Sequence, residues 1–533
     1  MYPRIISLPL ALQLAGLVRP IAGAYSDIAS VAEFIERLDL SPAASSYVTS
    51  ALNGSDVDSI SSLNEQEKAS YACLVTGAAL GADVVNQSAS NYVDMIQVNW
   101  CDSCWYEPRC IAQPKSAIEV SKALLVATFL GTKFAVRSGG HNPNPGFAGI
   151  DSQGVLIDMS HMNETSLSTD GTVASLGPGN RFSDVYETLN SMGKTIMGGR
   201  LNSVGLGGYF LGGGLTYFSS KYGLAADNIV NYEIVLANSS IISANATSHP
   251  DLWWALKGSG TNFGIVTRYD VKAQDNDSVW FEGLNYAPSQ NEKLLDAIIQ
   301  YASVAENDSN AAITFSLTPD SGFVEFIYGK PVERPAAYSM FYNISSSGTA
   351  INSTIGNMVA LNNAISNITP IPKMRRMIAS TGHKFDPPTL KGAYNMFLDF
   401  ASDVEKYNAT VGFVVQPFTS AAVLHATKTG GNPTGFNKTL QNLLSLSIEW
   451  KDSVHDNEVL TAFRNYTDRV EDLAKTNDVF LEAKAMNDAG YMQNVLASYG
   501  PKNLAQLRSI ATQYDPLKVF QDLQNNGFLL AKA

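Results

Sequence analysis

A short apolar run meets two glycines and a histidine in the stretch Lys133-Phe134-Ala135-Val136-Arg137-Ser138-Gly139-Gly140-His141-Asn142. The apolar part predicts a β-strand that ends at the glycines. Two successive glycines let the main chain turn with positive φ and let a bulky ligand approach it closely. Taken alone, the stretch equally describes a plain turn that exposes His141.

Two further glycine-rich loops favour a ligand-binding interpretation. The second runs from Gly198 to Gly214, and the third lies around 258–264. Three loops that offer bare backbone on one chain indicate a large, flat, polyanionic ligand. The second loop fails the dinucleotide fingerprint, because the pattern that begins at Gly205 has Phe210 where the third glycine should stand. It is therefore not a Rossmann turn.

Helices and strands alternate through the first half of the chain, which is an α/β pattern. Apolar spacing predicts a helix over 116–131, with Ser116 and Glu119 forming a capping box. A second helix is predicted over 182–192, with Asn180 as a candidate cap.

Composition changes after residue 271, where the glycine loops stop and Asn, Ser and Thr become frequent. We therefore expect a signal peptide (1–24), a helical lead-in (25–95), a first domain (96–271), an inserted domain (272–476) and a tail that returns to the first domain (477–533). At 533 residues the chain is long enough for two domains.

The net charge of the chain excludes some kinds of binding partner. The net charge is -13 and the pI is about 5.0, which argues against nucleic acid and against an anionic membrane surface. The histidines show no metal-ligand spacing, so no metal site is predicted.

Several features predict export. The N-terminus has Arg4, an apolar run and then small residues at Ala22-Gly23-Ala24, typical of a cleaved secretory signal, with a buried N-terminal helix as the alternative. Glycosylation sequons occur at Asn53, Asn86, Asn163, Asn238, Asn245, Asn276, Asn307, Asn343, Asn352, Asn367, Asn408, Asn437 and Asn465.

The four cysteines, Cys73, Cys101, Cys104 and Cys110, allow three disulfide pairings in an exported chain. The Cys-x-x-Cys at 101–104 could instead be redox-active or half of a metal site, although zinc would need a second such pair.

Six ordered motifs resemble the oxygen-dependent FAD-linked oxidoreductases, the group of berberine bridge enzyme and the carbohydrate oxidases. They are Arg137-Ser138-Gly139-Gly140-His141, Val204-Gly205-Leu206-Gly207-Gly208 through Gly212-Gly213-Gly214, Asp227-Asn228, Asp251-Leu252-Trp253-Trp254-Ala255, Asn262-Phe263-Gly264-Ile265-Val266-Thr267 and Tyr514-Asp515-Pro516.

The resemblance implies an α+β fold, with a two-subdomain PCMH-type FAD-binding domain and an inserted antiparallel-sheet substrate domain. It also implies FAD as the cofactor, bonded covalently to His141 through the flavin 8α-methyl. The residues that it implies in cofactor binding are His141, Arg137, Ser138, Gly139, Gly140, Asn142, Val204, Gly205, Gly207, Gly208, Gly212, Gly213, Gly214, Gly264, Ile265 and Val266.

The chain departs from the family pattern at two positions. Some members attach FAD a second time through a cysteine, and here that position is Leu201. Many members carry Tyr-x-Asn-Tyr-Ala-Asp, whose second tyrosine is the catalytic base, and here Asp488 takes its place. A buried carboxylate could accept a substrate proton if its pKa is raised. Asp488 could equally cap a turn beside Lys484.

We therefore expect a secreted or secretory-pathway FAD-linked oxidase that acts on a small specialised metabolite, with dioxygen as the reoxidant and hydrogen peroxide as product. Asp488 and Tyr499 are the candidate catalytic residues. A secreted carbohydrate oxidase and a non-redox isomerase or cyclase are the alternatives. His383, Gln416, His425 and Glu449 have no diagnostic spacing and are expected to be structural.

Overall fold

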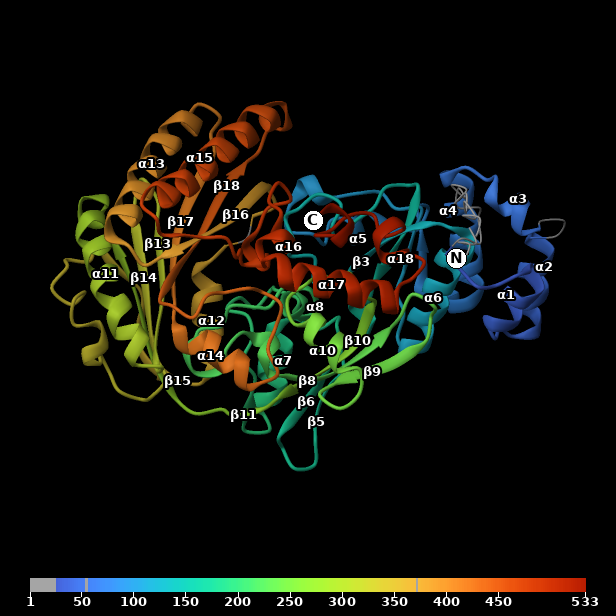
Figure 1. Ribbon diagram of the computed structural model, residues 1–533, viewed down its shortest axis with the longest axis horizontal. Coiled ribbons are helices and arrows are strands. Elements are labelled where there is room, and N and C mark those ends of the chain that lie inside the picture. The colour runs from blue at the N-terminus through green and yellow to red at the C-terminus, as the bar shows by residue number, and fades with distance from the viewer. Residues whose placement is uncertain (1–24, 53–55, 371) are drawn as a thin grey trace, which may run out of the picture.

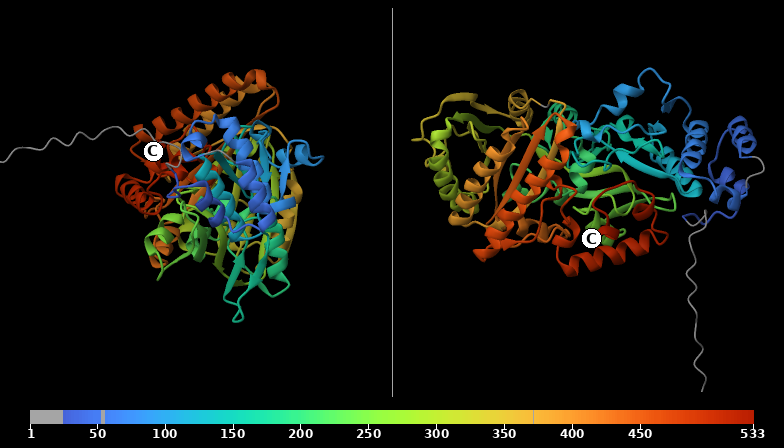
Figure 2. Two further views of the ribbon diagram at one scale, coloured as in Figure 1. Left: turned by 90° about the vertical axis from the view of Figure 1, so that its right-hand side faces the viewer. Right: turned by 90° about the horizontal axis from the view of Figure 1, so that it is seen from above.

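The computed structural model describes residues 25–52, 56–370 and 372–533 (Figure 1). The predicted signal peptide lies outside these residues. The α+β fold is confirmed. A half with a large antiparallel sheet lies beside a half with two smaller sheets, and the N-terminal helices cover the far end of the smaller-sheet half (Figures 1 and 2).

The first small sheet carries the stretch that ends at His141. Its strand order is β1-β2-β4-β3, with β2, β4 and β3 parallel. The strands are β1 Val84–Asn86, β2 Cys110–Ala112, β3 Lys133–Arg137 and β4 Gly154–Asp158. Because β3 ends at Arg137, the two glycines and His141 follow directly at one edge of the domain.

Helix α6 (Ala117–Leu130) connects β2 to β3, as the apolar spacing predicts. The Ser116 side chain accepts a hydrogen bond from the Glu119 N–H. The Glu119 carboxylate, however, accepts from the Lys115 N–H and leaves the capping box half formed. Gly131 ends the helix in the left-handed conformation.

Four helices precede this sheet: α1 Val31–Arg37, α2 Pro42–Ala51, α3 Val57–Ser61 and α4 Glu65–Leu80. A disulfide joins Cys73 on α4 to Cys110 on β2, which settles one of the three possible pairings. Cys101 and Cys104 are free, buried thiols.

The second small sheet is antiparallel, in the order β5-β6-β10-β8-β9. Its strands are β5 Thr165–Leu167, β6 Val173–Leu176, β8 Ile229–Val235, β9 Ile241–Asn245 and β10 Ile265–Lys272, and a short pair, β7 Lys194–Thr195 with β11 Gln274–Asp275, lies beside it. Helices α7 Phe182–Asn190, α8 Leu206–Leu211 and α10 Pro250–Leu256 belong to this subdomain.

Asn180 does not cap α7, contrary to the prediction. Arg181 is the N-cap residue, without a side-chain bond to the helix. The Asn180 amide instead donates to the carbonyls of Glu164 and Gly177, so it holds together the turn before the helix.

The large sheet has eight antiparallel strands in the order β15-β12-β14-β13-β17-β18-β16-β19. The strands are β12 Val279–Tyr286, β13 Ala311–Leu317, β14 Gly322–Tyr328, β15 Gly348–Gly356, β16 Arg375–Lys384, β17 Thr410–Phe418, β18 Gln441–Trp450 and β19 Phe480–Leu481. Helices α11 Asn291–Asn307, α13 Pro387–Glu405 and α15 Asp456–Thr476 pack on one face and bury the largest apolar cluster (Figure 1).

The opposite face of this sheet is turned toward the half that holds His141. Strand alternation places Thr314, Ser316, Glu325 and Gln416 on that face, because cross-strand partners share a side. Two shorter helices, α12 Met358–Ile368 and α14 Ser420–Lys428, flank it. The sheet therefore presents polar side chains on this face, beside an apolar cluster that contains Ala312, Ile327 and Phe218 and joins the two halves.

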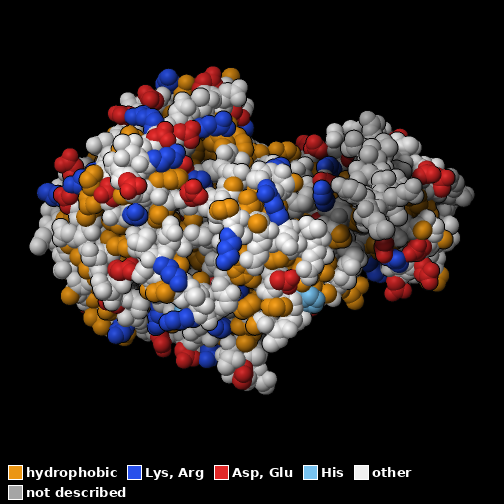
Figure 3. All heavy atoms as spheres, viewed as in Figure 1, with side chains coloured by type: hydrophobic (Ala, Val, Ile, Leu, Met, Phe, Trp, Pro, Cys, Tyr) orange, Lys and Arg blue, Asp and Glu red, His pale blue; other side chains and the backbone are white. Residues whose placement is uncertain are grey.

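The tail returns to the smaller-sheet half, with helices α16 Val495–Ser498, α17 Pro501–Tyr514 and α18 Val519–Asp522. Its main chain bonds to both sides of Phe134, since the Phe134 N–H donates to Leu523 and the Asn525 N–H donates to the Phe134 carbonyl. In the face seen in Figure 3, acidic and basic side chains are interspersed. Among the described residues, no helix is both long and apolar enough to cross a bilayer.

Candidate active site

His141 stands at the end of the β3 loop with its imidazole stacked on Trp100. The ring centroids are 4.0 Å apart and the planes differ by 23°. The Nε2 atom of His141 is buried and has no hydrogen-bond partner among the described residues. Burial lowers the pKa of His141 to about 4, and the charges of Arg181 and Arg376 add to the effect. The imidazole is therefore neutral near pH 7 and keeps a nucleophilic nitrogen.

The residues just before His141 anchor its loop. The Arg137 side chain forms a buried ion pair with Asp158, with Nε 2.6 Å from a carboxylate oxygen. The Ser138 hydroxyl donates to the Pro178 carbonyl at 2.5 Å and accepts from the Gly207 N–H at 3.3 Å. The Arg137 guanidinium is thus used to hold the strand, and Ser138 links the first and second glycine loops.

The first and second loops touch through glycine. A Cβ on Gly139 would lie 2.5 Å from the Gly205 Cα, and a Cβ on Gly205 would lie 2.3 Å from the Gly139 nitrogen. No side chain fits at either position without moving backbone. Gly140 has a φ of +70°, so the turn that presents His141 also depends on glycine.

Asn142 continues the first loop and is tied to the segment that carries Trp100. Its carbonyl accepts from the Asn99 side chain at 3.2 Å and lies 3.7 Å from the Cys104 sulfur. The Trp100 N–H donates to the Gly140 carbonyl. The stacking partner of His141 is therefore fixed to the loop that it covers.

The second loop ends in three glycines that pack on Asn487. The Asn487 Oδ1 accepts from the Gly214 N–H at 2.9 Å, and its amide lies 3.3 Å from the Tyr209 carbonyl. A Cβ on Gly212 would lie 2.4 Å from the Asn487 Nδ2. Gly213 and Gly214 have φ values of +99° and +75°. Val204 and Gly208 complete this loop, the first as a half-buried packing residue and the second with open space where its Cβ would be.

The third loop packs behind the second. The Gly260 N–H donates to the Leu211 carbonyl at 2.9 Å. A Cβ on Gly264 would lie 2.6 Å from the Val235 carbonyl oxygen, and the side chains of Ile265 and Val266 are buried in apolar clusters. Gly264, Ile265 and Val266 can therefore contact a ligand only through their main chain.

Asp488 ends the short 3-10 helix η8 (Met486–Asp488), next to Asn487. The Gln416 Nε2 on strand β17 donates to the Asp488 carboxylate at 3.1 Å. Burial raises the pKa of Asp488, while the Gln416 hydrogen bond and the charge of Arg200 oppose the rise. Lys484, the alternative partner, forms an ion pair with Glu471 instead. Asp488 thus has the environment of a proton acceptor.

Asn144 joins the His141 loop to the Asp488 segment. Its amide donates to the Ala489 carbonyl at 3.0 Å, and its Oδ1 accepts from the Tyr491 N–H at 2.7 Å. The structure therefore brings together the first loop, the second loop and Asp488, which lie far apart in the sequence.

Tyr499, the second candidate catalytic residue, lies apart from this group. Its hydroxyl donates to the Gly258 carbonyl at 2.7 Å, and its ring is buried in an apolar cluster with Met486 and Ala489. A hydroxyl held by a main-chain carbonyl in the core fastens the tail to the third loop.

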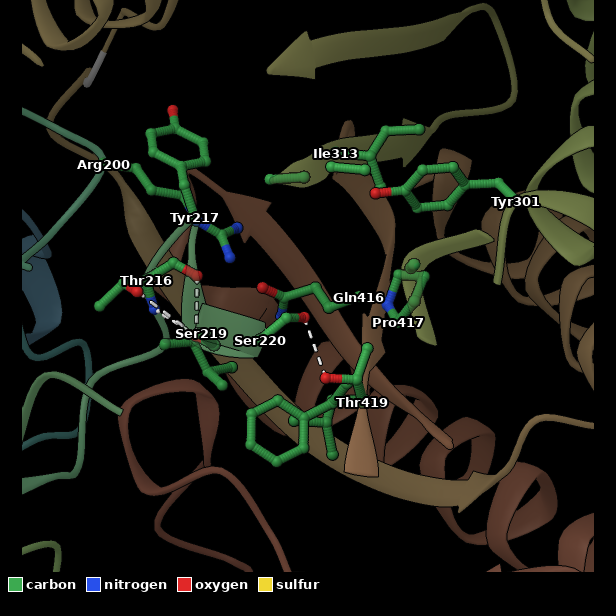
Figure 4. Close-up of a pocket in the computed structure, with 16 residues that line it drawn as sticks. Arg200, Thr216, Tyr217, Ser219, Ser220, Tyr301, Ile313, Gln416, Pro417 and Thr419 are labelled. Atoms are coloured by element: carbon green, nitrogen blue, oxygen red, sulfur yellow. Dashed lines mark hydrogen bonds between the residues drawn. The ribbon is translucent and has the colours of Figure 1, made fainter. Parts of the chain in front are cut away.

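A cavity of about 40 Å³ lies between the second loop and the large sheet (Figure 4). Arg200, Tyr217 and Gln416 are among its lining residues. Arg200 stands one residue before Leu201, which is partly buried against a separate apolar cluster. The side chains that face the cavity therefore come from both halves of the molecule.

Sequence analysis missed two residues of this region. It treated Gln416 as structural, but Gln416 holds Asp488. Glu325 on β14 is fully buried and accepts from the Tyr217 hydroxyl at 3.2 Å, and burial raises its pKa to about 7. The available signal was one acidic residue inside the apolar run Gly322-Phe323-Val324-Glu325-Phe326-Ile327-Tyr328. His383 and Glu449 are held by structural contacts, His383 to Asn442 and Glu449 to Arg376.

Comparisons with known proteins agree with this site. A family model described as FAD binding domain matches residues 108–245. An FAD-dependent monooxygenase of Arthrobotrys oligospora is 34% identical over 462 residues, which cover 86% of this chain and 89% of that protein. The bifunctional solanapyrone synthase of Alternaria solani is 33% identical over 437 residues, covering 79% and 82%.

The fold is shared with a solved structure of glucooligosaccharide oxidase from Acremonium strictum, whose FAD carries 6-S-cysteinyl and 8α-N1-histidyl links. The TM-score is 0.72 at 18% identity, over 84% of this chain and 97% of that one. Because the Arthrobotrys protein is 34% identical over most of both chains, the chain belongs to the FAD-linked oxidoreductases and is an FAD-dependent oxidoreductase, with the fold of the berberine bridge enzyme-like, PCMH-type proteins.

Proposed function

We propose that this protein is a secreted flavoprotein oxidase that carries FAD on a covalent bond to His141 and oxidises a small specialised metabolite. Dioxygen is the terminal electron acceptor, and hydrogen peroxide is the second product. The observation that carries the proposal is the buried Nε2 of His141, which has no partner at the tip of the first glycine loop. A buried polar atom without a partner costs free energy, so a neighbouring group is expected there.

The residues present fit FAD. His141 is neutral near pH 7, as attack on the flavin 8α-carbon requires. The N–H groups of the bare loops around Gly140 and Gly208 suit a pyrophosphate. Leu201 leaves only one covalent link available, because no thiol stands at the second position.

The proposed chemistry divides between cofactor and protein. FAD, when bound, accepts a hydride at N5. Asp488 accepts the proton that the substrate loses, since burial keeps its pKa raised and Gln416 orients the carboxylate. Trp100 and the loop around Asn142 exclude water from the imidazole of His141.

A small substrate is a stronger candidate than an oligosaccharide. The cavity beside the second loop is walled by residues from both halves of the molecule. The names of the relatives, FAD-dependent monooxygenase and bifunctional solanapyrone synthase, point to specialised metabolites rather than to sugars. A carbohydrate oxidase is therefore the weaker candidate.

A non-redox isomerase or cyclase is the second candidate, because burial raises the pKa of two carboxyl groups, Asp488 and Glu325, that both interact with the charge of Arg200. One could donate a proton while the other accepts one, without a net change in the flavin. The two classes separate in anaerobic photometry of the purified protein. Bleaching of the flavin absorbance on substrate addition supports the oxidase, and turnover without bleaching supports the isomerase.

Export is part of the proposal. The sequon asparagines that are exposed are Asn86, Asn163, Asn238, Asn307, Asn343, Asn352, Asn367, Asn408, Asn437 and Asn465. Glycans could attach there without disturbing the core. Recovery of a glycosidase-sensitive protein from the medium, with an N-terminus near Ala24, tests this part.

A further inference from the structure

The Arg200 guanidinium lines the cavity without any partner of its own. In the described chain no hydrogen bond or ion pair starts from this side chain, and its Nε is buried. Its central carbon lies 5.4 Å from the Tyr217 ring centroid. Figure 4 shows the guanidinium directed into the space in front of Gln416.

Two carboxyl groups lie near Arg200, yet neither pairs with it. Asp488 accepts from Gln416, and Glu325 accepts from Tyr217. Each acid is thus satisfied by a neutral donor. Both still sense the guanidinium, because its charge lowers the pKa of each carboxyl against the larger effect of burial.

The positive charge of Arg200 is not balanced by an ion pair with Asp488 or Glu325. Burial raises the pKa of both carboxyls, to about 7 for Glu325, so a neutral form is available to each. The buried Nε of Arg200 costs free energy, since it has lost water and gained no acceptor. A ligand that brings a negative charge would supply the missing acceptor.

We propose that Arg200 is the substrate-recognition residue of this site and that it binds a planar anion with two oxygens, a carboxylate or the enolate of a β-dicarbonyl compound. The inference rests on the proposed oxidase function and names the class of its substrate. The guanidinium suits this anion because its fork of N–H donors matches two coplanar oxygens. An anion held there lies on the side of the cavity that Gln416 lines, and Gln416 donates to the Asp488 carboxylate.

Ligand perturbation of the flavin spectrum tests the proposal in the oxidised holoenzyme. The carboxylate probe is benzoate with benzamide as its neutral analogue, and the enolate probe is dimedone with cyclohexanone as its neutral analogue. We expect one anion or both to bind and the neutral analogues to bind at least about tenfold more weakly. The anion that binds more tightly identifies the source of the two oxygens.

Three variants localise the effect. Arg200→Gln should weaken anion binding by about 10- to 100-fold, and Arg200→Lys should recover part of it, because lysine keeps the charge and loses the fork. Arg469→Gln is the matched control, since Arg469 is half-exposed on α15 and only loosely paired with Asp399. It should bind both anions as the wild type does.

Equal binding of anions and neutral analogues by the wild type would overturn the inference, and this comparison needs no variant to fold. An Arg200→Gln protein that changes the flavin spectrum but keeps its anion affinity would also overturn it and would assign Arg200 to the cofactor. The oxidase proposal fails differently. Anion binding that depends on Arg200, together with a flavin that no substrate bleaches, would retain the anion site and reject the oxidase.

Discussion

The side-chain oxygen of Asn487 accepts a hydrogen bond from the main-chain N–H of Gly214 at 2.9 Å. This contact fastens the segment that carries Asp488 to the second glycine loop, across 273 residues of sequence. Asp488, the proposed proton acceptor, is therefore tied to the second glycine loop, and we expect a change in the loop to alter the position of Asp488.

Gly212→Ala should break this unit. The new Cβ would lie 2.4 Å from the Asn487 Nδ2, so the amide must move and the Gly214 contact is lost. We expect a loss of about 1–3 kcal/mol in unfolding free energy and a fall in flavin content, measured by denaturant titration and absorbance. Gly77→Ala on α4 is the control, because nothing lies within 4 Å of its added Cβ. A Gly212→Ala protein as stable as this control would contradict the account.

Asp488→Asn should remove the proton acceptor. The turnover number should fall by about 10²- to 10⁴-fold while the flavin remains bound, as measured by peroxide release with a substrate found by screening. In the wild type the rate should rise with pH as Asp488 loses its proton. Retention of full activity in Asp488→Asn would show that another group accepts the proton.

Gln416→Met should shift that pH profile. The Gln416 hydrogen bond lowers the pKa of the Asp488 carboxyl, so its loss raises the pKa. The rising part of the pH–rate profile should then move to higher pH, while the maximal rate at high pH should change less. If the rising part of the pH–rate profile stays in place or moves to lower pH, Gln416 does not stabilise the ionised form of the group that titrates.

Glu325 should make stability depend on pH. Its pKa is raised from 4.5 to about 7 in the folded protein, so the folded state binds a proton that the unfolded state has lost. Its contribution is fully present below pH 4.5 and is lost as pH rises to about 7, a change of up to about 3 kcal/mol. Denaturant unfolding of wild type and Glu325→Gln at both ends of this window should show a smaller decline in the variant. Equal declines would place Glu325 in a solvated setting.

The disulfide between Cys73 and Cys110 should affect stability and not catalysis. Cys73 and Cys110 close a loop over a sequence separation of 37, so replacing both with Ser should cost about 4 kcal/mol. Replacing Cys101 and Cys104 with Ser, as the matched control, removes no disulfide of the described structure and should cost less. Equal losses in non-reducing unfolding experiments would contradict the pairing.

The elements that sequence analysis could predict are those with local signals. Glycine pairs, the strand before His141 and the helix at 117–130 are set by neighbours in sequence, and each stands where expected. The departure at Asp488 was also visible, because it breaks a local motif. These residues needed no knowledge of the fold.

The remaining contacts join distant parts of the chain. Gln416 meets Asp488 only because β17 of the large sheet faces the tail, and Glu325 meets Tyr217 across 108 residues of sequence. The contact of the Tyr499 hydroxyl could not be predicted either, because its acceptor, the Gly258 carbonyl, lies 241 residues away in the sequence. The disulfide pairing likewise depended on α4 lying over β2, which spacing alone leaves open.

The proposed covalent bond between His141 and FAD is the central claim, and one gel tests it most directly. The purified protein and His141→Ala are denatured in acid, washed and run under denaturing conditions, and in-gel flavin fluorescence is recorded. The account predicts a fluorescent band for the wild type and none for His141→Ala, with mass spectrometry placing FAD on the peptide that contains His141. A colourless wild-type band, or fluorescence that survives in His141→Ala, would contradict it.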